Sequence, residues 1–349
     1  MVRESKPEEP VLYPNGQVAN ISGGTDPTRT ITMPTAQSAV SRCDSSRFWP
    51  GRRVLVAGGT HGFGLVLARQ LAGSGARLLL VGRSSARVRT AMAACESAAA
   101  ATGYPADTIH GLAADLARPG EGDRAVAVCL EKLGGLDSLF FCIGRSGRTA
   151  VLKLPADELR AAVEVNLLTA VEISQAAAPP ICRAGGELVY IGSLAGKLVT
   201  PAMGAYAVSK AALAAFADAV RLEVAPQGGR VLLVSPGPIQ REPDPATTTD
   251  SGFHRYDDDV ARHGLSADVA APGGGAAVRL LDPEQLATEV LEACRRGRLE
   301  LTRPWKAALL AGLIEWFPAW GRRLLARFTA KNRRTGDHSP AGSAAGSRS

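Results

Sequence analysis

Tyr206 and Lys210 are the residues whose types and spacing most directly suggest chemistry in this sequence. They occur as Tyr-Ala-Val-Ser-Lys in a run that predicts a helix over Ala205–Val224, so their four-residue spacing should place both side chains on one helix face. A tyrosine is a poor acid–base catalyst at neutral pH because its unperturbed pKa is about 10. A nearby ammonium group favours the phenolate and lowers that pKa, so Tyr206 could exchange a proton with a substrate oxygen.

Two polar residues that precede this pair could complete a catalytic set. Ser193 lies thirteen residues before Tyr206 and just after the predicted strand Glu187–Ile191, where its hydroxyl could bond a substrate oxygen. Asn166 interrupts the apolar helix predicted over Asp157–Ala178, where an asparagine costs helix propensity and burial energy. Each feature alone has an ordinary explanation, since a serine after a strand is typical of a turn. Their order and their places on separate elements favour a shared site.

A glycine-rich segment, Ala57–Gly64, is the second candidate for binding chemistry. Gly58, Gly62 and Gly64 would let the backbone turn tightly and approach a pyrophosphate at the N-terminus of a helix. A plain glycine-rich turn is the alternative. The position between a predicted strand and a predicted helix favours dinucleotide binding.

Arg83 follows the second predicted strand in Val81-Gly82-Arg83-Ser84. Proteins that bind NAD tend to place an acid here for the ribose 2′-hydroxyl, whereas an arginine suits the 2′-phosphate of NADP. The sequence therefore favours NADP(H) over NAD(H). A solvated arginine at the end of a strand is the alternative.

These candidates are held by alternating strand and helix patterns, and the strand patterns are almost continuously apolar. Such strands are typical of a parallel sheet that is covered on both faces. The predicted strands are Val54–Ala57, Arg77–Val81, Ile109–Ala113, Ser138–Cys142, Glu187–Ile191, Arg230–Val234 and Arg298–Leu301, and the predicted helices are Leu65–Leu71, Ala86–Ala101, Ala125–Leu133, Asp157–Ala178, Ala205–Val224 and Glu284–Arg296. This alternation predicts an α/β fold with a doubly wound parallel sheet, a Rossmann fold in a single domain.

The motifs together resemble the short-chain dehydrogenase/reductase family over roughly Arg52 to Leu301. The spacing G-x-x-x-G-x-G is similar to the family's TGxxxGxG, with Ala57 in place of the threonine, and the order Asn, Ser, Tyr, Lys matches the family's catalytic residues. The resemblance implies hydride transfer between NADP(H) and a carbonyl or alcohol. The expected substrate is a small, hydrophobic molecule such as a ketone, a 3-oxoacyl compound or a sphingoid-like compound.

The resemblance assigns roles residue by residue. The implied catalytic residues are Asn166, Ser193, Tyr206 and Lys210, and the implied cofactor-binding residues are Gly58, Thr60, Gly62, Phe63, Gly64, Arg83, Asp115, Leu116, Gly144, Pro236, Gly237 and Ile239. By analogy, Asn166 would hold a water in a proton relay through Lys210. Asp115 would contact the adenine, although an aspartate that caps a turn is an equally ordinary explanation.

Two departures from the family pattern keep other functions open. Phe141-Cys142-Ile143-Gly144 stands where the family has Asn-Asn-Ala-Gly, and Arg241 replaces a threonine that meets the nicotinamide. A non-catalytic nucleotide-binding sensor or scaffold is therefore one alternative. Because the same residues serve either direction of hydride transfer, an NAD(P)-dependent alcohol dehydrogenase is the other. A non-catalytic protein would not need Ser193, Tyr206 and Lys210.

Composition argues against several other classes. The net charge of +7 is spread along the chain without a nucleic-acid-binding motif, so nucleic acid is not an expected partner. Six cysteines show no CxxC pairing and five histidines show no metal-ligand spacing, so neither disulfides nor a metal site is expected. The N-terminus lacks an apolar signal core and no apolar run reaches about 20 residues, which predicts a cytoplasmic enzyme.

The regions around the predicted domain carry no motif. Residues 1–50 are rich in Pro, Gly, Ser and Thr and predict a flexible leader ahead of the domain at 51–302. The polar segment between Pro236 and Asp282 predicts an active-site lid or a disordered loop. Residues 303–331 predict an amphipathic or apolar helical extension that meets a membrane surface, the domain itself or a partner subunit, and 332–349 a disordered tail. The resemblance also implies a homo-oligomer.

Overall fold

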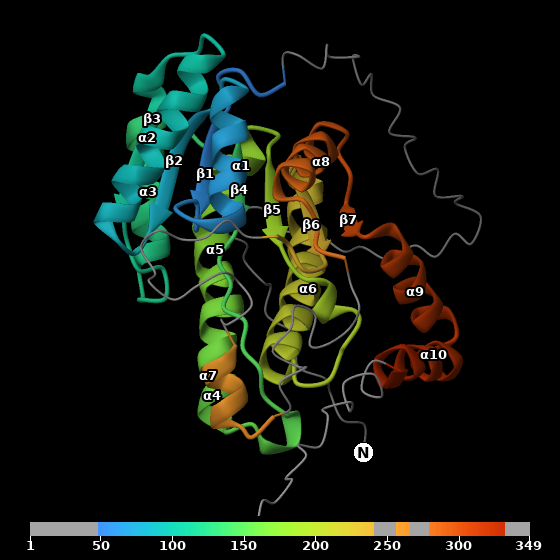
Figure 1. The fold of residues 1–349 in the computed structure, drawn as a ribbon. Coiled ribbons are helices and arrows are strands. Elements are labelled where there is room, and N and C mark those ends of the chain that lie inside the picture. Colours follow the sequence, from blue (N-terminus) through green and yellow to red (C-terminus); the bar gives the residue numbers. More distant parts are fainter. Residues whose placement is uncertain (1–47, 241–255, 266–278, 332–349) are drawn as a thin grey trace, which may run out of the picture. The chain divides into compact units, whose positions relative to one another are not determined.

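Seven strands form one sheet within the residues that the computed structural model describes, 48–240, 256–265 and 279–331. They are β1 (Arg53–Ala57), β2 (Arg77–Gly82), β3 (Ile109–Ala113), β4 (Ser138–Phe141), β5 (Glu187–Ile191), β6 (Arg230–Pro236) and β7 (Glu300–Arg303). Their order is β3-β2-β1-β4-β5-β6-β7, and every neighbouring pair is parallel. This is the doubly wound sheet that the sequence predicts, and Figure 1 shows β3 and β7 at its two edges.

Helices cover both faces of the sheet, which explains why the strands are apolar at nearly every position. They are α1 (Gly62–Gly73), α2 (Ser85–Ala101) and α8 (Pro283–Arg295) on one face, and α3 (Glu121–Leu133), α5 (Thr169–Arg183) and α6 (Gly204–Val224) on the other. Side chains alternate between these layers, so Leu55 packs toward α3 and α5 whereas Val54 and Val56 pack toward α1 and α2.

The last predicted strand begins two residues later than the sequence suggests. The residues directly after α8 form its C-terminal cap. Gly297 has a φ of +62°, and the N–H of Arg298 donates to the carbonyl of Ala293. The strand β7 therefore starts at Glu300 instead of Arg298. The N-terminal end of α8 follows its sequence signals, with the side chain of Asp282 accepting the N–H of Gln285 at 2.7 Å.

The single helix predicted over Asp157–Ala178 is wrong in one respect. The chain forms α4 (Ala156–Val163), then a five-residue π-helical turn at Glu164–Leu168, and then α5. The hydroxyl of Thr169 donates to the carbonyl of Glu164, five residues earlier, at 3.0 Å. Asn166 lies in this wider turn, and such turns are frequent at functional sites.

The fold also begins earlier than the predicted boundary at residue 51. Trp49 is only 7% exposed and packs 6.0 Å from the ring of Phe140 in β4. The guanidinium of Arg52 lies 4.5 Å from the ring of Phe48. Phe48–Pro50 therefore belong to the folded part, because an aromatic pair supplies apolar surface that the composition of the leader obscures. Residues 1–47 lie outside the described part of the chain.

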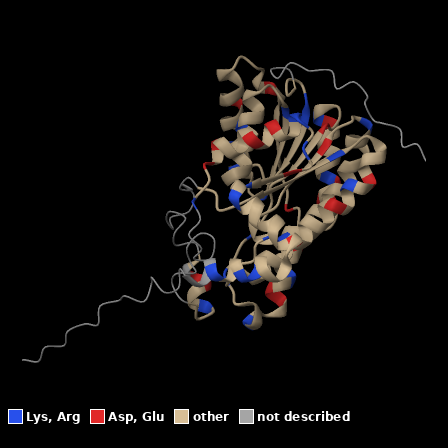
Figure 2. Ribbon diagram, turned by 90° about the vertical axis from the view of Figure 1, so that its right-hand side faces the viewer, with Lys and Arg blue, Asp and Glu red and all other residues tan. Residues whose placement is uncertain are grey.

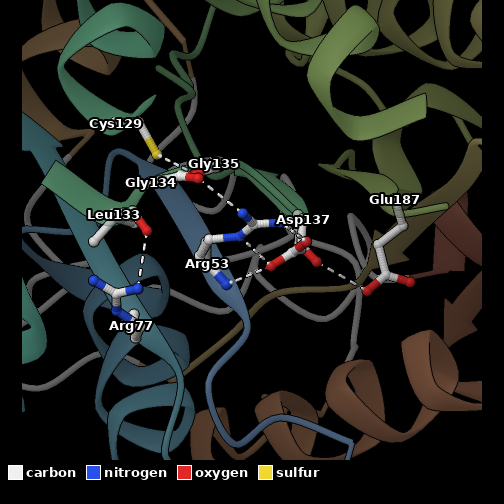
Figure 3. Close-up of polar contacts among 9 residues, drawn as sticks. Arg53, Arg77, Cys129, Leu133, Gly134, Gly135, Asp137 and Glu187 are labelled. Atoms are coloured by element: carbon white, nitrogen blue, oxygen red, sulfur yellow. Dashed lines mark hydrogen bonds and ion pairs between the residues drawn. The ribbon is translucent and has the colours of Figure 1, made fainter. Parts of the chain in front are cut away.

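Opposite the carboxyl ends of the strands, charged residues fasten β1 to β4 (Figure 3). The guanidinium of Arg53 lies 2.6 Å from Oδ1 of Asp137, and its Nε donates to Oδ2 at 2.9 Å. Burial raises the pKa of the Asp137 carboxyl, but the hydrogen bonds and charge of Arg53 outweigh that effect and hold the pKa below its usual value. This clamp sets the register of the two strands whose far ends approach the site.

Two parts of the chain after β6 contain helices, where the sequence predicts a lid or disordered loop for the first and a helical extension for the second. The segment between Pro236 and Asp282 contains α7 (Asp257–Arg262) and a bridge from Ile239 to Leu281, whereas Arg241 lies outside the described residues. Beyond β7 the chain forms α9 (Trp305–Trp316) and α10 (Pro318–Lys331), drawn in red in Figure 1. None of the described helices is long and apolar enough to cross a membrane.

Candidate active site

One cavity of about 1680 Å³ opens at the carboxyl ends of the strands. The carboxyl ends of parallel strands meet at one edge of a sheet, so residues far apart in sequence converge there. Every residue that the sequence assigns to the cofactor lines this cavity: Gly58, Thr60, Gly62, Phe63, Gly64, Arg83, Asp115, Leu116, Gly144, Pro236, Gly237 and Ile239. Ser193, Tyr206 and Lys210 line it too, whereas Asn166 is fully buried behind the wall.

The glycine-rich loop after β1 has a backbone path that larger residues could not follow. Gly58 and Gly62 have φ values of +83° and +54°, which L side chains rarely adopt. A Cβ at Gly64 would lie 2.2 Å from the carbonyl oxygen of Gly58, so loop and helix touch backbone to backbone. The first N–H groups of α1 have no intrahelical acceptors, and they suit a phosphate. The cradle fits the pyrophosphate of a dinucleotide.

The end of β2 excludes an acidic side chain at Gly82. A Cβ there would lie 2.4 Å from the hydroxyl of Thr60, which is itself buried. Arg83 follows, exposed and lining the cavity. Asp115 also lines the cavity, and its carboxylate accepts the N–H of Ala117 at 3.3 Å, so its turn-forming role and its place at the site coexist.

Lys210 is buried beside Tyr206 on α6. Its Nζ donates to the carbonyl of Ile191 at 2.9 Å and contacts the carbonyl of Ile143 at 3.5 Å, so it is held by the ends of β5 and β4. Burial lowers the pKa of Lys210 from its ordinary value to about 8. A Cβ at Gly144 would lie 3.1 Å from this ammonium, so glycine leaves room for it.

Tyr206 and Ser193 stand at the same wall. Tyr206 is half-buried and packs against Ala195, Met203 and Ala207. The hydroxyl oxygen of Ser193 accepts the N–H of Ala195 at 3.1 Å, which caps a short turn after β5. That bond uses only an acceptor site of the serine hydroxyl, so its hydrogen could be donated to a group in the cavity.

Asn166 is fully buried and bonds protein groups on two other segments. Its Oδ1 accepts the N–H of Arg145 at 2.7 Å, and its Nδ2 donates to the carbonyl of Arg145 at 3.0 Å and to the hydroxyl of Ser209 at 2.8 Å. Both amide hydrogens are thereby used, and Oδ1 keeps one lone pair. The π-helical turn at Glu164–Leu168 brings this side chain between the loop after β4 and α6.

Apolar packing takes the place of the family's two asparagines. Phe141, at the first asparagine position, is fully buried in the core, and a Cβ at Gly64 would lie 3.1 Å from the Cβ of Cys142, at the second. Ile143 stands where the family has alanine, and its Cγ1 would lie 3.1 Å from a Cβ at Gly58. Cys142 lines the cavity, and burial raises the pKa of its thiol to about 12, so it stays protonated at neutral pH. Cys142 and Ile143 therefore meet the glycine loop through packing, where two asparagines would offer amide hydrogen bonds.

Several cavity residues carry no signal in the sequence. Tyr256, next to α7, bonds the hydroxyl of Ser146 at 2.6 Å, and the guanidinium of Arg148 lies 3.7 Å from its ring centre. The inner sides of α9 and α10 add apolar wall, including Leu310, Leu313, Leu324 and Leu325. Neither the polar segment nor the extension contains a motif that points to this cavity. Within the described residues, no group of three or more His, Cys, Asp or Glu side chains could hold a metal ion.

A dinucleotide cradle beside a Ser-Tyr-Lys group at one sheet edge is the arrangement of a nucleotide-dependent oxidoreductase. The family model of the short chain dehydrogenases matches residues 52–250, and the chain belongs to this family. It is an NAD(P)-dependent dehydrogenase or reductase that transfers hydride to or from a small molecule.

Individual relatives agree with this assignment. The chain is 29% identical over 252 residues to dehydrogenase/reductase SDR family member 7B of Bos taurus, covering 71% of this chain and 72% of that protein. It is 25% identical over 280 residues to hydroxysteroid 11-beta-dehydrogenase 1-like protein A of Xenopus laevis, covering 80% and 87%. A short-chain dehydrogenase structure from Streptomyces avermitilis is similar in fold, with a TM-score of 0.60, 22% identity and coverage of 81% and 98%.

Proposed function

We propose that this protein is an NADP(H)-dependent reductase of a bulky hydrophobic ketone. The observation that carries the proposal is a shared cavity wall. Ser193, Tyr206 and Lys210 border the same space as the apolar side chains of α9 and α10. The similarity to a hydroxysteroid 11-beta-dehydrogenase 1-like protein supports a large, largely apolar substrate.

The residues of this chain suit proton transfer to the substrate oxygen. Bound NADPH would supply the hydride that the carbonyl carbon accepts. Ser193 orients the carbonyl by a hydrogen bond, and the Tyr206 hydroxyl protonates its oxygen, so the ketone gains both hydrogens of an alcohol. Lys210 places a buried positive charge beside Tyr206, which favours the phenolate left behind. Asn166 would support the return of a proton through a water and Lys210.

The size and lining of the cavity support a substrate larger than a simple ketone. Ligand sites in proteins are typically about 300–1,000 Å³. The volume of about 1680 Å³ leaves room for a second, sizeable molecule beside a dinucleotide. Leu310 and Leu313 of α9 and Leu324 of α10 give that room an apolar end.

NADPH consumption with a series of straight-chain ketones tests the function. We expect kcat/KM to rise with chain length by about fourfold per methylene, because each buried methylene is worth about 0.8 kcal/mol. The variant Leu313→Trp, which fills the apolar end, should shorten the preferred chain. A flat response would contradict the hydrophobic substrate, and no NADPH consumption with any carbonyl would favour the sensor or scaffold. Oxidation of the matching alcohols alone would favour the dehydrogenase.

The outward side of the C-terminal helices supports contact with an anionic membrane surface. Trp305, Trp316 and Trp320 are 60%, 82% and 59% exposed. The helix α10 carries Arg322, Arg323 and Arg327 and no acidic residue, and Figure 2 turns this side toward the viewer. Tryptophan with basic residues suits the boundary of a bilayer with anionic lipid. A second copy of the chain on these helices is the competing account.

Sedimentation with anionic vesicles distinguishes the two accounts. We expect the full chain to bind at low salt and to be released as salt screens the basic residues. The double variant Trp316→Ala/Trp320→Ala should bind at least about tenfold more weakly, since burying one large apolar side chain is worth about 1.5–3 kcal/mol. Leu222→Ala on α6, which removes another exposed apolar side chain, is the control. A chain that ignores the vesicles, or tryptophan variants that only dissociate an oligomer, would contradict the membrane account.

A further inference from the structure

Ser209 stands between Tyr206 and Lys210 on α6, yet it does not line the cavity. Its side chain is fully buried, and its hydroxyl oxygen accepts a hydrogen from Nδ2 of Asn166 at 2.8 Å. The same hydroxyl donates to the main-chain carbonyl of Tyr206 at 2.9 Å. The one hydrogen of the hydroxyl and one of its acceptor sites are therefore committed to fixed partners.

The partner of Ser209 is itself tied to the loop at the end of β4. The amide of Asn166 bonds both the N–H and the carbonyl of Arg145, directly after Gly144 at the cavity wall. Three segments are thus joined through two side chains: the loop after β4, the π-helical turn and the first turns of α6. The hydrogen bond between Ser209 and Asn166 links the first turns of α6 to the other two segments.

We propose that Ser209 is a positioning residue for proton transfer, because it fixes the turn of α6 that carries Tyr206 and Lys210. Lys210 is held at its far end by the carbonyls of Ile191 and Ile143. The backbone of Tyr206 is held through Ser209, so loss of this hydroxyl lets the phenol move relative to the ammonium. The inference rests on the proton-transfer roles assigned above to Tyr206 and Lys210.

Ser174 offers a matched control for a purely structural role. It is also buried, and its hydroxyl bonds the hydroxyl of Tyr190 at 2.7 Å. Neither Ser174 nor Tyr190 lines the cavity. Alanine at either serine removes a buried hydroxyl and its bond to another side chain, and Ser209→Ala also loses the bond to the Tyr206 carbonyl, so both variants should lose stability.

The experiment compares Ser209→Ala and Ser174→Ala in the full chain. We expect both to melt at a lower temperature, but only Ser209→Ala should lower kcat, by about tenfold, since small misplacements at a reacting centre cost that much or more. KM and cofactor affinity should stay within about twofold, because Ser209 reaches neither ligand. Asn166→Ala added to Ser209→Ala should cost less than the product of the two single losses.

A second measurement does not depend on turnover. The phenol of Tyr206 can be followed by ultraviolet absorbance as pH rises, with Tyr206→Phe as the blank that identifies its signal. Ser209→Ala should shift this titration upward in pH, whereas Ser174→Ala should leave it in place. An unchanged titration, or equal kcat losses in the two serine variants, would overturn the role of Ser209. A wild-type chain without turnover, but with the shifted titration, would overturn the proposed reaction and leave the positioning role standing.

Discussion

Replacing Tyr206 with phenylalanine is expected to lower turnover by about 10²–10⁴-fold, the usual worth of a general acid, with cofactor affinity nearly unchanged. The substitution keeps the ring that packs on Met203 and Ala207 and removes only the hydroxyl. Lys210 would stay buried, but its charge would no longer act on a proton donor. Turnover at saturating substrate and NADPH binding by fluorescence titration give the two quantities.

A second tyrosine in the cavity, Tyr256, provides a control for this substitution. Tyr256 also lines the cavity, and its hydroxyl bonds Ser146 at 2.6 Å. Tyr256→Phe removes the same group from another wall, so it should change KM for the substrate much more than kcat. Equal turnover of Tyr206→Phe and the wild type would remove Tyr206 from the mechanism. Equal losses of turnover in both tyrosine variants would mean that Tyr206 has no special role as the proton donor.

The parts of the site that the sequence predicts are those set by local spacing. The four-residue spacing of Tyr206 and Lys210 on a helix brings their side chains together. The strongly apolar strands place the glycine loop and Ser193 at one edge of the sheet. These features depend on periodicity and on the common direction of parallel strands. Helix periodicity and strand direction do not depend on the details of side-chain packing, so these features could be predicted from the sequence.

The parts that the sequence misses depend on contacts between distant segments. The π-helical turn at Asn166 differs from an α-helix by one inserted residue, and its side chain bonds Arg145 and Ser209, 21 and 43 residues away. No local propensity encodes those partners. The sequence does not predict the place of Tyr256 at the cavity for the same reason, because its hydrogen-bond partner Ser146 lies 110 residues away.

The proposed preference for NADP(H) rests on the end of β2, where two observations support it. A side chain at Gly82 would collide with buried Thr60, so the acid typical of NAD-binding proteins has no space there. Arg83, the next residue, is exposed at the cavity and offers a charged fork that matches a phosphate. The 2′-phosphate is the group by which NADP differs from NAD, so a change at Arg83 should act on one cofactor only.

Arg83→Ala is therefore expected to weaken NADPH binding by about ten- to a hundredfold, the scale of a charge-assisted hydrogen bond, and to leave NADH binding nearly unchanged. Arg89→Ala is the matched control. It removes the same charge from an exposed position on α2 that does not line the cavity. Calorimetric or fluorescence titration measures the affinity of the wild type and of both variants for each cofactor. Added salt should reduce the loss of NADPH affinity in Arg83→Ala, because salt screens an exposed charge. If Arg83→Ala weakens both cofactors equally, or if the wild type prefers NADH, Arg83 is a solvated residue at the end of a strand. The preference would then have to come from elsewhere in the cradle.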